Sequence, residues 1–431
     1  MRRSSTLALG GAAALGAIMA VAWWVGLPEG VGMRGFVAFA LGIAALQGVA
    51  VWALWQQTGA FTLALVVVLG VVFRLGAWAW PMDLSTDLYR YAWDGRVQLA
   101  GHSPYAAPPG DESLEALRDD AIWPRINRKQ ALTVYPPGAQ LLFLSLAAVG
   151  LRSVGAIKGA AILAEFCGML LLAGALRRRG VPDGRLALYA WSPLVIAEVG
   201  VSGHLDAFVL PLLLLGLLAS ERGARSLAGL ALGLATLMKL YPLLLFAALP
   251  REQRGRAIAV AGLLALALYG VYFAISGPAV LGFLPHYLGS AEDFNVGLRA
   301  LVEWLLGFLG SRARPAAMLV CAAALAGTVA WIARRPDRDS YLRAGQVALA
   351  FVLLAPTAMH PWYALWMIPF LCVRASPAGL WLGATLPLSY LKYGPPDGPM
   401  PTWVTGLIWI PAFAALMLAA MRGKILRGER P

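Results

Sequence analysis

The chain has 431 residues, of which 60% are hydrophobic and only 13% are charged. Soluble domains carry about 25% charged residues, so the composition excludes a soluble globular protein and predicts an all-α protein that crosses a membrane many times. The net charge of +13 does not indicate a nucleic-acid partner, because Lys and Arg accumulate in the cytoplasmic loops of membrane proteins.

Three apolar runs open the chain, and each is long enough for a transmembrane helix: 6–26, 35–55 and 60–80. The arginines that follow Met1 place the N-terminus in the cytoplasm by the positive-inside rule. The third span then ends outside, and the polar segment 81–155 becomes a large first extracytoplasmic loop. Within it, the run 138–150 is too short for the ~30 Å apolar core, so we expect a juxtamembrane helix in the interface.

The rest of the chain is predicted to continue crossing, with the basic clusters inside. The run 226–250 is too long for one span, and we expect two short helices that meet near Lys239, because Pro242 disfavours a helical conformation before it. The other predicted helices cover 156–176, 185–201, 207–220, 257–276, 313–333, 343–357, 362–373, 376–391 and 403–421. This predicts one integral membrane domain over 1–431, with about 12–14 transmembrane helices and both termini in the cytoplasm.

This topology places ionisable residues from distant segments on the outer side. On a helix, Asp87, Arg90, Tyr91 and Asp94 share one face. The other outer residues are His204, Asp206, Lys239, His286 and His360. Charged groups near membrane depth are costly and usually face a cavity, so their convergence indicates a functional site.

Each of these residues also has a structural interpretation. Asp87 and Asp94 would pair with Arg90 on a solvated helix, and Lys239 would extend to the interface. Glu165, in the middle of a predicted span, is expected to pair with a buried base such as Arg74 and not to take part in chemistry. The three cysteines lie far apart in apolar runs, which indicates packing, since no metal-binding or redox spacing is present.

Short polar motifs punctuate the chain in a fixed order. They are Asp87-Leu-Tyr-Arg-Tyr-Ala-Trp-Asp-Gly-Arg-Val97, Gly101-His-Ser-Pro-Tyr105, Thr133-Val-Tyr-Pro-Pro-Gly-Ala-Gln140, Gly203-His-Leu-Asp-Ala207, Met238-Lys-Leu-Tyr-Pro242 and Met359-His-Pro-Trp-Tyr363. Together they resemble the bacterial branch of the GT-C membrane glycosyltransferases, in particular polyprenol-phosphate-mannose-dependent mannosyltransferases and, more distantly, the GPI mannosyltransferases. The resemblance covers residues ~60–375 in motif order.

The resemblance implies a GT-C-like bundle in the bacterial inner membrane with its active site on the extracytoplasmic side. Such enzymes take a sugar from a polyprenyl-phosphate carrier and transfer it, usually with inversion. An acidic residue of the first outer loop, or a late histidine, serves as the base. These positions correspond to Asp87 and His360 in this chain.

The chemistry of the transfer assigns further candidate roles. An acceptor hydroxyl must lose its proton as it attacks, which requires a carboxylate or imidazole within reach. The phosphate leaving group needs no general acid but does need cations, for which Lys239, Arg90 and Arg96 are candidates. The candidates for substrate binding are Asp94, Tyr91, His204, Asp206, Tyr135 and Trp362. No nucleotide-sugar and metal motif of the Asp-X-Asp type lies in a cytoplasmic loop, and a divalent metal is neither required nor excluded.

The sequence therefore predicts a glycosyltransferase that moves a hexose, with mannose favoured, from a polyprenyl-phosphate donor to an extracytoplasmic lipid or glycan acceptor. No cofactor is required, and the expected partners are the donor, the acceptor and membrane lipids. The alternative is a transporter or flippase of a lipid-linked glycan, which lacks support from internal repeat symmetry. A non-catalytic scaffold is a third alternative, against which the clustered ionisable residues argue.

Overall fold

Apolar helices make up most of the computed structural model, which describes residues 2–28, 30–81, 84–289, 294–335, 339–393 and 400–426. The chain is 78% helical, and no strand occurs in these ranges. Seven helices in the described ranges are long and apolar enough to cross a membrane. The predicted all-α, multi-pass membrane protein is therefore confirmed.

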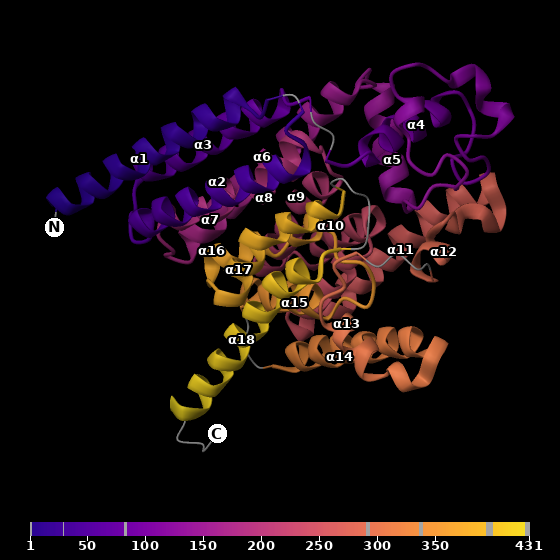
Figure 1. Ribbon diagram of the computed structural model, residues 1–431. Coiled ribbons are helices and arrows are strands. Elements are labelled where there is room, and N and C mark those ends of the chain that lie inside the picture. Colours follow the sequence, from indigo (N-terminus) through magenta and orange to yellow (C-terminus); the bar gives the residue numbers. More distant parts are fainter. Residues whose placement is uncertain are drawn as a thin grey trace.

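The long helices agree closely with the predicted spans. Helices α1 (Arg2–Val25), α2 (Gly32–Leu54) and α3 (Ala60–Trp78) pack side by side at one end of the molecule (Figure 1). The other long ones are α6 (Val154–Arg178), α11 (Arg251–Ser276), α14 (Ala313–Arg334) and α18 (Thr402–Leu426). Their exposed positions carry large apolar residues, as is required where a helix faces lipid.

The juxtamembrane helix predicted over 138–150 is α5 (Pro137–Ala148), and the first of the two short helices predicted over 226–250 is α10 (Arg225–Met238). Several predicted spans are also shorter helices, which are α9 (Asp206–Glu221), α15 (Ser340–Leu354), α16 (Ile368–Val373) and α17 (Pro377–Thr385). At 1.5 Å per residue, a helix of 15 residues such as α15 spans only ~22 Å, less than the apolar core. The predicted 12–14 helices thus compare with seven in the described ranges that are long and apolar enough to cross, or eight when the bent pair Pro193–Val201 and Asp206–Glu221 counts as one span.

The run 185–201, predicted as one span, is instead a series of short pieces. They are η3 (Asp183–Leu186), α7 (Ala187–Ala190), α8 (Pro193–Ile196) and the π turn η4 (Ala197–Val201). Pro193 cannot donate a backbone hydrogen bond, and the Ser192 hydroxyl caps the new helix by accepting from the N–H of Val195. Nearly all of this run is buried, so protein and not lipid surrounds it.

The predicted break at Lys239 is confirmed. Helix α10 ends at Met238, Lys239 is extended with φ −150° and ψ 134°, and the 3-10 helix η5 (Tyr241–Ala248) follows. The lysine thus lies between two short helices, where its side chain is not confined to a helix surface.

The predicted first loop folds over one end of the bundle and is described except for residues 82 and 83. It holds α4 (Asp87–Leu99) and the short 3-10 helices η1 (Glu112–Leu117) and η2 (Trp123–Arg125), and it leads into α5 (Figure 1). Helices α4 and α5 approach closely at Gly95, where a Cβ atom would lie 2.5 Å from the carbonyl oxygen of Phe143.

The chain between α11 and α18 completes the bundle. Its remaining elements are η6 (Gly277–Leu281), α12 (Leu284–Gly289), α13 (Leu298–Leu305), η7 (Gly307–Arg312), η8 (Pro361–Ala364) and η9 (Leu386–Tyr393). The N–H of Phe283, just before α12, donates to the carbonyl of Thr133 at 2.8 Å. This bond joins the end of α11 to the first loop.

The predicted partner of Glu165 is also confirmed. Its two carboxylate oxygens accept hydrogen bonds from Arg74 at 2.6 and 2.8 Å, and both side chains are fully buried. The hydroxyl of Tyr189 donates to the same carboxylate. This pair lies between α3 and α6 and is structural.

Candidate functional site

Asp87 opens helix α4 and faces the loop that follows it. The Asn127 side chain donates a hydrogen bond to Asp87 Oδ1 at 3.1 Å. Desolvation by the surrounding protein raises the pKa of Asp87, and the hydrogen bond from Asn127 and the charge of Lys239 only partly offset this. A raised pKa makes the carboxylate a stronger proton acceptor near neutral pH.

Lys239 and Asp206 form an ion pair beside this carboxylate. The Asp206 side chain is fully buried, and that of Lys239 is 17% exposed. Tyr241 donates from its hydroxyl to Asp206 Oδ1 at 2.7 Å, and Lys239 Nζ lies 5.0 Å from the centroid of the Tyr363 ring. The pair therefore fixes one cation, with some access to solvent, within electrostatic reach of Asp87.

His360 is buried among positive charges. Desolvation, followed by the charges of Lys239, Lys392 and Arg128, lowers the pKa of His360 to about 3. The imidazole is thus neutral at pH 7 and only weakly basic. Of the two predicted bases, Asp87 is the one whose surroundings strengthen it as a proton acceptor.

Trp362 lies between the two predicted histidines. Its ring stacks on His204 at a centroid distance of 4.2 Å and on His360 at 4.4 Å. Both faces of the indole are therefore covered by protein. In this arrangement only the ring edge remains for a substrate.

Tyr91 and Tyr135 form an aromatic cluster with Phe143 of α5. The Tyr91 ring stacks on Phe143 at 4.8 Å and meets the Tyr135 ring edge-on at 5.2 Å. Desolvation raises the pKa of both tyrosines well above the usual value, so both stay protonated. The Tyr91 hydroxyl accepts from the N–H of Leu205 at 3.4 Å, which ties α4 to the His204 loop.

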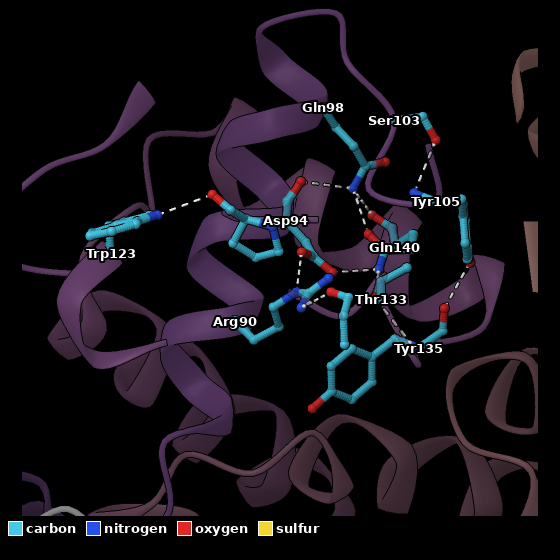
Figure 2. A network of polar contacts seen from close by, with 11 residues as sticks. Arg90, Asp94, Gln98, Ser103, Tyr105, Trp123, Thr133, Tyr135 and Gln140 are labelled. Carbon is cyan, nitrogen blue, oxygen red and sulfur yellow. Dashed lines mark hydrogen bonds and ion pairs between the residues drawn. The ribbon is translucent and has the colours of Figure 1, made fainter. Parts of the chain in front are cut away.

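Asp94 and Arg90 belong to a buried network beneath the loop (Figure 2). Arg90 Nε donates to Asp94 Oδ1 at 2.7 Å, and Gln140 Nε2 donates to Oδ2 at 2.8 Å. Gln140 also donates to the Thr133 hydroxyl, and Arg90 donates to the carbonyl of Ala131. Asp94 thus pairs with Arg90, as the structural interpretation predicted, but the pair is buried and not solvated. It holds α4, α5 and the loop together, whereas Asp87 accepts from Asn127 instead.

Arg96 makes similar structural contacts. It donates to Asp119 Oδ2 at 2.6 Å and to the carbonyl of Leu117 at 2.9 Å. These contacts hold the end of η1 against α4. Among the three predicted phosphate-binding cations, only Lys239 lies in the cluster with Asp206 and the histidines.

A cavity of about 510 Å³ opens between residues 128–132 of the first loop and residues 282–286. It is lined by Arg128, Lys129, Gln130, Ala131, Leu132, Gly282, Phe283 and His286. Arg128 directly follows Asn127, the hydrogen-bond partner of Asp87, and has a left-handed backbone with φ 48°. Non-glycine residues rarely adopt this conformation, and it recurs at functional sites. The predicted outer-face His286 thus belongs to the cavity wall.

Glu198 and Tyr390 are part of this region but were not among the predicted residues. The Tyr390 hydroxyl donates to Glu198 Oε1 at 2.6 Å, and Glu198 Oε2 lies 3.3 Å from His204 Nε2. The sequence offered one sign that Glu198 has a special role, because it is a single carboxylate within an apolar run. No group of three or more His, Cys, Asp or Glu in the described ranges is arranged to hold a metal ion.

Comparison with known proteins identifies the family. No curated protein matches the chain. The model of glycosyltransferase family 87 matches residues 133–361, which is more than half of the chain. The matched segment includes His204, Lys239 and His360, whereas Asp87 and α4 precede it. The chain belongs to glycosyltransferase family 87.

Proposed function

We propose that this family 87 enzyme transfers a hexose, with mannose favoured, from a polyprenyl phosphate to a lipid or glycan acceptor. The reaction takes place on the extracytoplasmic side of the bacterial plasma membrane. The observation that supports the proposal most directly is that Asp87, a carboxylate of raised pKa, lies within electrostatic reach of the partly exposed cation Lys239. Membership of the family favours sugar transfer over the transporter and scaffold alternatives.

Asp87 acts as the general base in this proposal. The acceptor hydroxyl gives its proton to the Asp87 carboxylate as its oxygen forms a bond to the anomeric carbon of the donor sugar. The bond between that carbon and the phosphate oxygen breaks, and the polyprenyl phosphate leaves with the electron pair. A single displacement of this kind inverts the anomeric configuration.

Lys239 stabilises the leaving phosphate. The negative charge on the phosphate oxygen increases as the bond breaks, and a cation fixed beforehand stabilises that charge without reorganisation. Asp206 and Tyr241 hold the lysine in place. The neutral His360 serves as a hydrogen-bonding group beside the donor, since charges around it disfavour its protonated form.

The acceptor occupies the cavity between residues 128–132 and 282–286, whose wall begins at the residue after Asn127. Its volume of about 510 Å³ lies within the 300–1,000 Å³ range of small-molecule sites. Phe283, whose ring centroid lies 5.6 Å from the Arg128 guanidinium, lines the cavity together with the polar side chains of Lys129, Gln130 and His286. Asn127 joins this cavity to the base through its hydrogen bond to Asp87.

Transfer of labelled mannose from synthetic polyprenyl-phosphate mannose, measured with the purified enzyme in nanodiscs, tests the role of Asp87. Asp87→Asn should reduce kcat by about 10²–10⁴-fold, the usual contribution of a general base. Asp111→Asn is the matched control, because Asp111 is a carboxylate of the same loop whose contacts are to Ser113. Wild-type turnover by Asp87→Asn removes that residue from the role.

A further inference from the structure

Glu198 is a fully buried carboxylate in an unusual backbone segment. It lies in the π turn Ala197–Val201, just before the chain bends by 120° between Pro193–Val201 and Asp206–Glu221. Single π turns within helical segments are rare and are frequent at functional sites. The proposed mechanism uses neither Glu198 nor the turn.

The ion contact of Glu198 differs from those of the other deeply buried carboxylates. In the described ranges, each of the others pairs with an arginine or lysine: Asp94 with Arg90, Glu165 with Arg74, and Asp206 with Lys239. The ion contact of Glu198 is with an imidazole, that of His204, with Nε2 and Oε2 3.3 Å apart. Burial lowers the pKa of the His204 imidazole well below its usual value, so the ring is neutral at pH 7 and does not supply the charge that an arginine or lysine supplies to the other carboxylates.

The contact also leaves polar atoms unsatisfied. His204 is 1% exposed, and its two ring nitrogens form no hydrogen bond with any described residue. Glu198 Oε2 also has no hydrogen-bond partner among these residues. Unpartnered buried polar atoms are rare in native proteins and require an explanation other than stability. Tyr390 holds the other carboxylate oxygen at 2.6 Å, so the carboxylate itself is fixed.

A column of stacked rings leads from this pair to His360. The His204 ring stacks on Trp362 at 4.2 Å, and Trp362 stacks on His360 at 4.4 Å with only 5° between the ring planes. Phe294 covers the other face of His360 at 4.5 Å, and its carbonyl accepts from the N–H of Met359 at 2.8 Å. Rings packed this closely cannot tilt independently.

We propose that Glu198 and His204 are positioning residues that set the orientation of the His360 ring through Trp362. The proposal rests on the proposed function, in which His360 lies beside the donor. The Glu198 carboxyl group is fixed by Tyr390 and lies 3.3 Å from His204 Nε2. It therefore restricts how the His204 ring lies, and the stacked column carries that orientation to His360. Partners that orient a functional histidine typically change activity by about 10–100-fold.

Histidine NMR of the full-length protein in nanodiscs measures directly whether a change at Glu198 alters the surroundings of the His204 and His360 rings. The chain contains four histidines, so ¹⁵N-histidine labelling gives few signals, and His204→Phe and His360→Asn assign two of them. The test variant is Glu198→Gln, which keeps the shape and an oxygen acceptor for Tyr390 but replaces the carboxyl oxygen that faces His204 with an amide nitrogen. Glu165→Gln is the matched control, because Glu165 is an equally buried carboxylate in an ion pair with Arg74.

Glu198→Gln should shift the ring signals of both His204 and His360 and should reduce kcat by about 10-fold. The KM for the donor should stay near that of the wild type, since Lys239 is untouched. Glu165→Gln should lower the melting temperature and leave both histidine signals in place. A merely structural role for Glu198 predicts the same pattern for the two variants, which would overturn the proposal.

The NMR result does not depend on the reaction. If the His360 signal is unchanged in Glu198→Gln, the positioning role is wrong even when the enzyme transfers mannose. If the signal shifts but no variant or wild type uses polyprenyl-phosphate mannose, the proposed donor is wrong and the coupling stands. Should Glu198→Gln fail to fold, Tyr390→Phe, which removes the hydroxyl bonded to Glu198, must produce the same two shifts, and their absence refutes the proposal.

Discussion

Lys239→Gln separates the structural role of the lysine from its proposed role in donor binding. Removing one partner of a buried ion pair leaves the other charge uncompensated, at a cost of about 3–5 kcal/mol. Asp206 is fully buried, but it keeps its hydrogen bond from Tyr241, and Lys239 is 17% exposed. We therefore expect Lys239→Gln to lower the free energy of unfolding by about 3 kcal/mol, the lower end of this range. Denaturant unfolding in detergent measures this change.

The double variant Lys239→Gln/Asp206→Asn removes the orphaned charge. It should recover most of the lost stability, because two neutral amides replace the pair. Donor use should not recover, since no cation faces the phosphate, and the KM for polyprenyl-phosphate mannose should stay at least ten-fold above that of the wild type, or about 1.4 kcal/mol. Recovery of wild-type donor KM by the double variant would refute the role of Lys239 as a phosphate ligand.

Three further predictions concern the base, the loop and the cavity. The pKa of Asp87 is raised, and its ionised form is the active one. We therefore expect kcat/KM to be retained at neutral pH and lost as the pH falls through a midpoint above the usual value of about 3.9. A pH profile whose activity instead falls with a midpoint near 6.5, and loses this dependence in His360→Asn, would assign the base to the histidine. Gly95→Ala should abolish transfer, because the new Cβ would lie 2.5 Å from the Phe143 carbonyl oxygen and separate α4 from α5, whereas Gly155→Ala, where the nearest atom lies at 3.8 Å, should retain wild-type turnover. Arg128→Gln should raise the KM for the acceptor and not for the donor in steady-state assays, with Arg118→Gln as the loop control; an equal rise in both KM values would contradict the cavity assignment.

Local chemistry and the need to pair buried charges were sufficient for some predictions. The break before Tyr241 followed from Pro242, and the structure has it at Lys239. The partner of Glu165 followed from the cost of a lone buried carboxylate, and Arg74 fills that role. A proline restricts the residue before it in any helical protein, and a buried carboxylate needs a partner in any protein interior.

Hydropathy alone could not reveal the irregular segment around Glu198. A run of apolar residues reads as one span whether it forms a continuous helix or four short pieces, because burial in protein and in lipid select the same residues. The Ser192-Pro193 pair was the only local sign of a break. Tyr390 lies 192 residues from Glu198, a pairing that no local pattern predicts.

Charge alone likewise could not separate phosphate-binding arginines from structural ones. Arg96 reaches Asp119, 23 residues along the chain, and Gln140 reaches Asp94 across 46 residues. Such contacts depend on how the loop folds back on α4 (Figure 2). The sequence predicts that the candidates lie on one side of the membrane, and the tertiary contacts distinguish their surroundings.

The central claim is that the sugar comes from a lipid phosphate. The most direct measurement offers the purified enzyme in proteoliposomes two labelled donors, synthetic polyprenyl-phosphate mannose and GDP-mannose, with a lipid glycan acceptor. We predict transfer from the polyprenyl phosphate alone, with inversion at the anomeric carbon. Transfer from GDP-mannose without the lipid carrier, or movement of the lipid-linked sugar across the bilayer without transfer, would contradict it.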